Sequence, residues 1–144
     1  HPDFGWYGIH GVEMLFTVMG TGCKYVSRMS TDSVVDVVTG QWENGNIGTF
    51  RGMQTGKAIY GGTAFTENGS QPVGPYNGYL DLLKEILKFF KTREAPVSAK
   101  ETLEIFTFME ASNISKAKSG KIISMEDTYK KAEKKADKIL KKYK

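Results

Sequence analysis

The sequence is poor in the side chains that most often hold metal ions or form cross-links. Its 144 residues include one cysteine and two histidines. A single thiol excludes an intrachain disulfide and a cysteine-based metal site, and two imidazoles argue against a histidine-rich metal site. A membrane-spanning helix needs about 20 mostly apolar residues in a row. The sequence has no apolar run of this length, so no membrane-spanning helix is predicted. With 40% hydrophobic residues, the chain predicts one domain with a packed core.

Basic charge is concentrated at the C-terminal end. The whole chain has a net charge of +4, whereas residues 121–144 alone hold nine basic and four acidic side chains. Apolar residues from Met125 onward recur at alternating steps of about four and three, which predicts a basic amphipathic helix over residues 125–144. Acidic residues interrupt the lysines, and no aromatic reading surface accompanies them. We therefore favour a solvated face of a packing helix over binding to nucleic acid or membrane.

A β-meander is predicted between residues 23 and 66. Asn44-Gly45 lies between two strand-like runs, and it predicts a two-residue type I′ hairpin turn because both residues tolerate positive φ. Apolar residues occupy both faces of the strand before this turn. We therefore expect helices of this chain to cover one face of the sheet and another subunit or domain to cover the other. The expected strands are Cys23–Ser30, Ser33–Trp42, Ile47–Met53 and Lys57–Thr66.

Helices are expected on either side of this meander. Ser98 and Glu101 form a predicted capping box, and Ser124 is a predicted N-cap. Residues 68–75 are rich in chain-breaking residues and are predicted to form a loop. The helical spacing of apolar residues predicts four helices, at 7–19, 79–90, 98–119 and 125–144.

Two glycine-rich segments resemble phosphate-binding motifs only superficially. Gly20-Thr21-Gly22 lacks the third glycine of a dinucleotide fingerprint and follows a predicted helix instead of a strand. Residues 52–58 are one residue short of a P-loop and have Ala58 where the metal-binding hydroxyl belongs. We therefore expect turns at both places and no nucleotide site within this chain.

His10 is the main candidate for a functional residue. It lies near the start of the first predicted helix, flanked by glycines that leave room for a ligand. An imidazole can act as a general acid or base near neutral pH, although most histidines are structural. Glu13, one turn later, is placed to orient the ring or simply to be solvated. Arg51 is a candidate for binding an anionic or hydroxylated substrate, and a cross-strand pair with Asp36 is the simpler role.

Four segments, taken together, point to a family. They are Tyr7-Gly8-Ile9-His10-Gly11-Val12-Glu13, Val37-Val38-Thr39-Gly40-Gln41-Trp42, Ile47-Gly48-Thr49-Phe50-Arg51-Gly52 and Glu101-Thr102-Leu103-Glu104-Ile105-Phe106-Thr107-Phe108-Met109-Glu110-Ala111. In this order and spacing they resemble the C-terminal half of the Gfo/Idh/MocA oxidoreductases, such as glucose-fructose oxidoreductase and inositol dehydrogenase. The resemblance covers about residues 4–123 and leaves the C-terminal tail outside it.

The resemblance implies an α+β domain with a mostly antiparallel sheet. Helices would pack on one face, and the other face would serve subunit association. Residues 1–124 would form this substrate-binding and oligomerisation domain, with residues 125–144 as an added helix. The family also has an N-terminal Rossmann domain, absent from this chain, that binds NAD or NADP and carries a Glu-Lys-Pro motif. On this expectation the chain alone is inactive.

The resemblance also implies a role for His10. Family members often carry Asp-x-Gly-x-His here, with the histidine transferring a proton to or from a substrate hydroxyl. Gly8 and His10 match this motif, whereas Trp6 stands at the Asp position. Sugars or polyols are the implied substrates, and aromatic rings can stack on them. The candidate substrate-binding residues are Trp6, Tyr7, Glu13 and Arg51.

The sequence thus predicts the C-terminal domain of a sugar or polyol oxidoreductase that depends on NAD or NADP. The expected partners are the N-terminal domain and a second copy of this chain, which would bind through the open sheet face. No nucleic acid or membrane partner is expected. The rival hypothesis is a non-catalytic small-molecule-binding or scaffold domain that keeps the sheet interface, which Trp6 at the Asp position permits.

Overall fold

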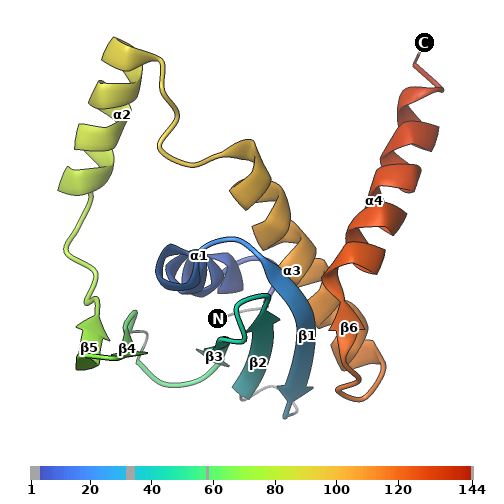
Figure 1. Cartoon of the computed structure of the whole chain (residues 1–144), viewed down its shortest axis with the longest axis horizontal. Helices are drawn as coiled ribbons and strands as arrows, with labels where there is room; N and C mark the ends of the chain where they lie inside the picture. Colours follow the sequence, from blue (N-terminus) through green and yellow to red (C-terminus); the bar gives the residue numbers. More distant parts are fainter. Residues whose placement is uncertain (1–3, 32–34, 58, 144) are drawn as a thin grey trace. The chain divides into compact units, whose positions relative to one another are not determined.

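A computed structural model of the chain describes residues 4–31, 35–57 and 59–143 (Figure 1). The described residues form two compact units. The first unit runs to Thr55 and resumes at Lys100, and the second is Gly56–Ala99. The predicted strand start at Ser33 and Ala58 of the rejected P-loop lie outside the described residues.

A four-stranded antiparallel sheet forms the centre of the first unit. The three long strands confirm the predicted positions, and the predicted hairpin joins the second to the third. Its turn type was wrong. Gly45 has a φ of +86° whereas Asn44 keeps a negative φ, so the loop is a longer one in which only the glycine is left-handed. The strands, in sheet order, are β3 (Ile47–Met53), β2 (Val35–Trp42), β1 (Cys23–Ser30) and β6 (Ile123–Ser124).

The predicted fourth strand of the meander is not part of this sheet. Instead, β4 (Gly62–Thr66) pairs with β5 (Gly69–Val73) in a two-stranded sheet of the second unit. The predictions of one continuous meander and of a loop over residues 68–75 were therefore wrong. Each strand of a two-stranded sheet has an unpaired edge, where Pro72 is tolerated although it donates no hydrogen bond.

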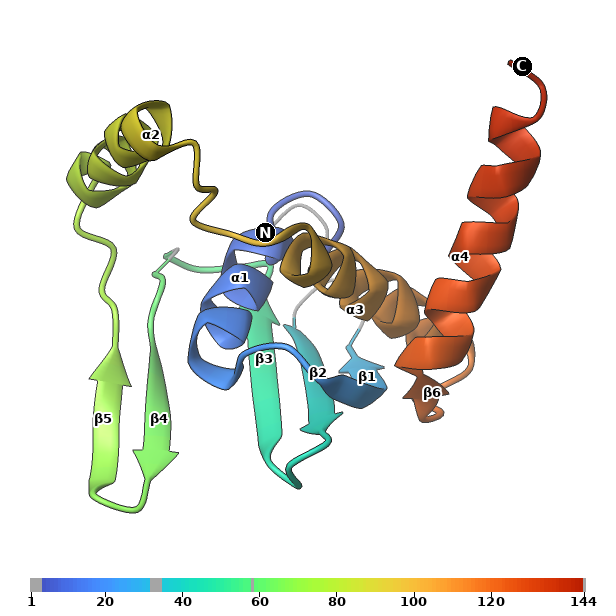
Figure 2. The ribbon, with the colours of Figure 1, turned by 45° about the horizontal axis from the view of Figure 1, so that its top comes forward.

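Two helices cover one face of the four-stranded sheet, as Figure 2 shows. They are α1 (Gly8–Met19) and α3 (Ala99–Ala117). Phe16 of α1 and Phe108 of α3 meet edge to face, with ring centroids 5.6 Å apart, above the buried strand residues. The core cluster of this face includes Val12, Phe16, Val26, Val38, Trp42, Phe50, Ile105 and Phe108.

Glycines allow this close approach of helix and sheet. A Cβ atom added at Gly11 would lie 2.4 Å from the Phe50 ring, and one at Gly40 would lie 2.8 Å from the Phe108 ring. Either contact is far shorter than van der Waals packing permits. The two glycines therefore set how deeply α1 and α3 sit on the strands.

Among the described residues, the other face of the sheet carries exposed side chains, and we call it the open face. The strand register aligns Tyr25 with Gln41, Met29 with Val37, and Val37 with Arg51 on this face. Several of its apolar side chains are exposed, namely Tyr25, Met29, Ile47 and Met53. The predicted α+β fold, with an antiparallel sheet and helices packed on it, is confirmed. The use of the open face for association stays a prediction.

The C-terminal helix begins next to this sheet. Ser124 caps α4 (Met125–Leu140), because its Oγ accepts a hydrogen bond of 3.2 Å from the Asp127 N–H, as predicted. Ser124 also belongs to β6, which pairs with β1 and was not predicted. The first turn of α4 packs near β1, whereas its residues from Lys130 onward are exposed. Among the described residues, no helix is both long and apolar enough to cross a membrane.

The second unit contains the β4–β5 hairpin and α2 (Leu80–Thr92). This helix confirms the one predicted at residues 79–90. It is amphipathic, with Leu83, Ile86 and Leu87 on its apolar side, and the helix contains no buried residue. The predicted capping box before α3 stays a prediction.

Candidate active site at the start of helix α1

The start of α1 is fixed by an aromatic anchor. Phe4 is 2% exposed, and its ring centroid lies 5.4 Å from that of Phe50 on β3. A Cβ atom at Gly8 would lie 2.8 Å from the Phe4 ring. The glycine therefore lets the described segment before α1, which we call the lead-in, pack against the first turn of the helix. His10 is therefore held at the N-terminal end of a well-anchored helix.

Three of the predicted site residues lie together here. His10 Nδ1 lies 3.3 Å from Glu13 Oε2, and the ring centroids of Tyr7 and His10 are 6.2 Å apart in an edge-to-face arrangement. We call these three residues the His10 cluster. The side chains of His10 and Glu13 are 55% and 53% exposed, so a solute can reach the imidazole.

The contact with Glu13 also affects the tautomer of the imidazole. A carboxylate beside Nδ1 favours the proton on that nitrogen and the lone pair on Nε2. Both groups are half exposed, so water competes for this contact. The arrangement can therefore orient a group that accepts and returns a proton.

The other two predicted site residues are placed differently. Trp6 directly precedes the cluster and is 74% exposed. Arg51 lies on the open face of the sheet, opposite Val37, whereas α1 packs on the helix-covered face. The structure therefore does not bring Arg51 to His10. The suggested pair of Arg51 with Asp36 was wrong, because Asp36 is opposite Gly52 and faces the core.

The partner of Asp36 is Arg28, which the sequence analysis did not single out. Arg28 donates from Nε and Nη2 to Asp36 Oδ1 at 3.0 and 2.8 Å, and the two side chains are 4% and 1% exposed. Arg28 also donates to Asn113 Oδ1 on α3 at 2.7 Å, and its guanidinium lies 4.4 Å from the Phe4 ring centroid. This network joins β1, β2 and α3 to the lead-in of α1.

The environment of Asp36 favours its charged form. Burial raises the pKa of this carboxyl, but hydrogen bonds from Ser30 and Arg28, together with the Arg28 charge, outweigh burial and leave the pKa below its ordinary value. A sequence signal existed for this pair. Asp36 alternates with Val38 on the buried side of β2, and a carboxylate at such a position needs a partner.

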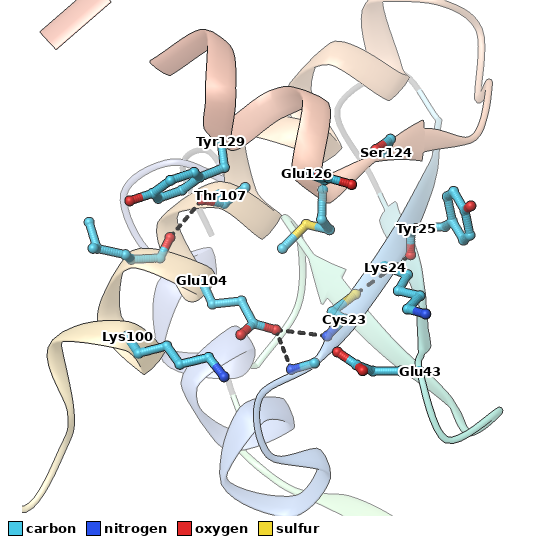
Figure 3. Close-up of a pocket in the computed structure, with 13 residues that line it drawn as sticks. Cys23, Lys24, Tyr25, Glu43, Lys100, Glu104, Thr107, Ser124, Glu126 and Tyr129 are labelled. Atoms are coloured by element: carbon cyan, nitrogen blue, oxygen red, sulfur yellow. Dashed lines mark hydrogen bonds between the residues drawn. The ribbon is translucent and has the colours of Figure 1, made fainter. Parts of the chain in front are cut away.

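A separate cleft of about 750 Å³ opens where α3, α4 and the start of β1 meet (Figure 3). Within it, Glu104 Oε1 accepts hydrogen bonds from the backbone N–H groups of Gly22 and Cys23 at 2.6 and 2.7 Å. Burial, followed by the nearby Glu104 charge, raises the pKa of the Cys23 thiol to about 12. The thiol is therefore protonated at neutral pH and is a poor nucleophile.

The glycines of Gly20-Thr21-Gly22 connect α1 to β1, so the predicted turn is confirmed. A dinucleotide fingerprint has the opposite order, with a strand leading into a helix. Among the described residues, no three His, Cys, Asp or Glu side chains converge as metal ligands would. Comparisons with protein-family models, curated proteins and solved structures found no match to this chain.

Proposed function

We propose that this chain is the C-terminal, substrate-binding and oligomerisation domain of a sugar or polyol oxidoreductase of the Gfo/Idh/MocA type. The proposal is supported mainly by the His10 cluster, in which a carboxylate lies beside an exposed imidazole. The family motif places a carboxylate at the position of Trp6, whereas here the carboxylate beside the imidazole comes from Glu13, one helical turn later. The ring thus has an orienting partner despite the departure from the motif.

In this proposal His10 handles the proton of the substrate hydroxyl. The lone pair on Nε2 accepts this proton when the substrate is oxidised, and the imidazolium returns it in the reverse direction. Glu13 holds the ring through Nδ1. Tyr7, whose ring lies edge to face with the imidazole, and Trp6, the residue before it, are exposed aromatic side chains on which a sugar ring can stack.

The nicotinamide cofactor belongs to the proposed N-terminal domain. The glycine segment at residues 20–22 does not fit a dinucleotide, because it leads from a helix into a strand. Its glycine N–H groups are also engaged, since that of Gly20 donates to the Phe16 carbonyl and that of Gly22 donates to Glu104 Oε1. The segment at residues 52–57 begins in the last two residues of β3 and continues into the second unit. Hydride transfer is therefore not assigned to any residue of this chain.

Substrate binding at this place has a direct test. We titrate the isotope-labelled chain with a panel of sugars and polyols and follow its NMR signals. The signals of Tyr7, His10 and Glu13 are expected to shift at the lowest ligand concentrations. The Glu104 cleft serves as the internal control, because its residues should shift less at the same ligand concentration. Shifts confined to the cleft, or no shifts with any member of the panel, would remove the substrate site from the start of α1.

Self-association is proposed to use the open sheet face, with a second copy of the chain as occupant. Met29, the last residue but one of β1, is 74% exposed on this face. Met29→Lys is expected to weaken self-association by roughly 100-fold, because two like charges would be buried in a two-fold interface. Sedimentation velocity over a concentration series measures the change.

The matched control for this substitution is Val18→Lys. Val18 is 45% exposed on α1, on the helix-covered side of the sheet. Val18→Lys introduces the same charge away from the open face, so it should leave self-association unchanged. Equal effects of the two variants, or a chain that is monomeric at every concentration, would reject the open face as the interface.

A further inference from the structure

The chain contains three Asn-Gly pairs, Asn44-Gly45, Asn68-Gly69 and Asn77-Gly78. An Asn-Gly pair can rearrange without any enzyme. The backbone nitrogen of the glycine attacks the side-chain carbonyl carbon of the asparagine, a carbon–nitrogen bond forms, and the side-chain amide leaves as ammonia. Water then opens the cyclic succinimide to aspartate or isoaspartate. Glycine favours this attack because it has no side chain to block it and restricts the backbone least.

The structure of the first pair, Asn44-Gly45, disfavours this reaction. Asn44 Oδ1 accepts a hydrogen bond of 3.0 Å from the Asn46 N–H, which fixes the asparagine side chain. The Gly45 N–H, which would have to attack, donates to the Trp42 carbonyl at 3.0 Å. Both reacting groups are therefore engaged, in a turn that joins two strands of the four-stranded sheet.

The second pair is held less firmly. Asn68 and Gly69 lie at the tip of the β4–β5 hairpin, where Gly69 is opposite Thr66 in the register. Thr66 Oγ1 donates to the Gly69 carbonyl at 2.9 Å and accepts from the Asn68 N–H at 3.2 Å. However, this sheet has only two strands, and such a hairpin is marginally stable by itself.

The third pair has no such restraint. Asn77 and Gly78 are exposed and lie in irregular chain just before Tyr79, the N-cap of α2. Within the described ranges, no hydrogen bond engages the Asn77 side chain or the Gly78 N–H. The asparagine side chain can therefore rotate toward the glycine nitrogen without first breaking a turn or a strand pair.

We propose that Asn77 is a modification site at which the chain spontaneously converts to aspartate and isoaspartate, with Asn68 slower and Asn44 slowest. Reaction at the two hairpins requires local opening of the turn. Its rate is therefore proportional to the population of the open state, which is smaller for the more stable hairpin. The new carboxylate at position 77 lies two residues before the N-cap of α2, where the partial positive charge of the helix end favours an anion.

The test compares the three pairs within one chain. The folded protein is incubated in mildly alkaline buffer made with ¹⁸O-water, and peptide mapping by mass spectrometry gives the fraction converted at each asparagine over time. We expect Asn77 to react roughly tenfold faster than Asn44, with Asn68 between them. Asn77→Gln should remove the fastest signal and leave the other two rates unchanged.

The same incubation in concentrated urea separates structure from sequence. The three rates should converge when the chain is unfolded, because all three sites are then the same dipeptide in an open chain. Equal rates in the folded protein, a faster reaction at Asn44, or an unchanged spread of rates in urea would each overturn the proposal.

Discussion

Replacing Arg28 with methionine is expected to lower the free energy of unfolding by about 3–5 kcal/mol, the range found when one partner of a buried ion pair is removed. The substitution leaves the Asp36 carboxylate, which is 1% exposed, without the guanidinium that neutralises it. It also removes the donor to Asn113 and the cation above Phe4, so the lead-in of α1 loses part of its support. Urea denaturation followed by tryptophan fluorescence measures the loss.

Two further variants make this result specific. The double variant Arg28→Met/Asp36→Leu should recover most of the stability, because no buried charge remains unpaired. Lys130→Met breaks the exposed pair with Glu126 on α4 and should leave the free energy of unfolding nearly unchanged. If Arg28→Met costs no more than Lys130→Met, the buried pair does not have the structural role assigned to it.

The same pair predicts a pH dependence. The folded-state pKa of Asp36 lies below its ordinary value of 3.8. The carboxylate therefore contributes stability that is fully present above about pH 3.8, declines below it, and is lost as the pH falls through the folded-state pKa. As the pH falls through this acidic range, the free energy of unfolding of the wild type should decrease more than that of the double variant. A difference that is constant with pH would contradict the assigned charge state.

His10→Ala has the largest expected effect on activity. Once the chain is joined to its proposed nucleotide-binding half, the variant should lower kcat by about 100-fold for the best substrate of a sugar and polyol screen. The imidazole is the group proposed to move the hydroxyl proton. Its side chain is 55% exposed, so the free energy of unfolding should hardly change. Steady-state kinetics and urea denaturation of the same preparation measure both.

The controls for this prediction separate chemistry from packing. Glu13→Gln keeps the side-chain shape but removes the charge beside Nδ1, so we expect an intermediate loss of about tenfold. Glu133→Gln on the exposed part of α4 removes a charge far along the sequence and should have no effect. Added imidazole should partly restore His10→Ala. Unchanged turnover in His10→Ala would retire the assignment and favour the rival binding or scaffold domain.

Periodicity predicted most of the fold, and its failures have identifiable causes. The apolar spacing of α1 and the alternation along β1, β2 and β3 are long enough to show a period, and these elements were placed within a few residues. β6 has two residues and thus shows no period. β5 contains a glycine and a proline, which indicate a loop in sequence but are tolerated on a strand with an unpaired edge.

The candidate site was predictable only where neighbours in sequence are neighbours in space. Positions 10 and 13 are three apart on a helix, so the approach of Glu13 to His10 follows from helical geometry. The place of Arg51 depended on which face of β3 packs against the core. Phe50 and the glycines two residues before and after it set that face, so Arg51, one residue after Phe50, lies on the other. The Arg28–Asp36 pair required the register of two strands, which spacing alone does not give.

The most direct test of the account is the sequence of the reading frame upstream of His1. We expect it to encode a strand, a Gly-x-Gly-x-x-Gly or Ala turn and a helix, followed by a Glu-Lys-Pro motif, as the proposed nucleotide-binding domain requires. Such a sequence would make this chain the substrate half of an oxidoreductase. A start codon close to His1, with no such domain before it, would contradict the central claim and leave a binding or scaffold domain in its place.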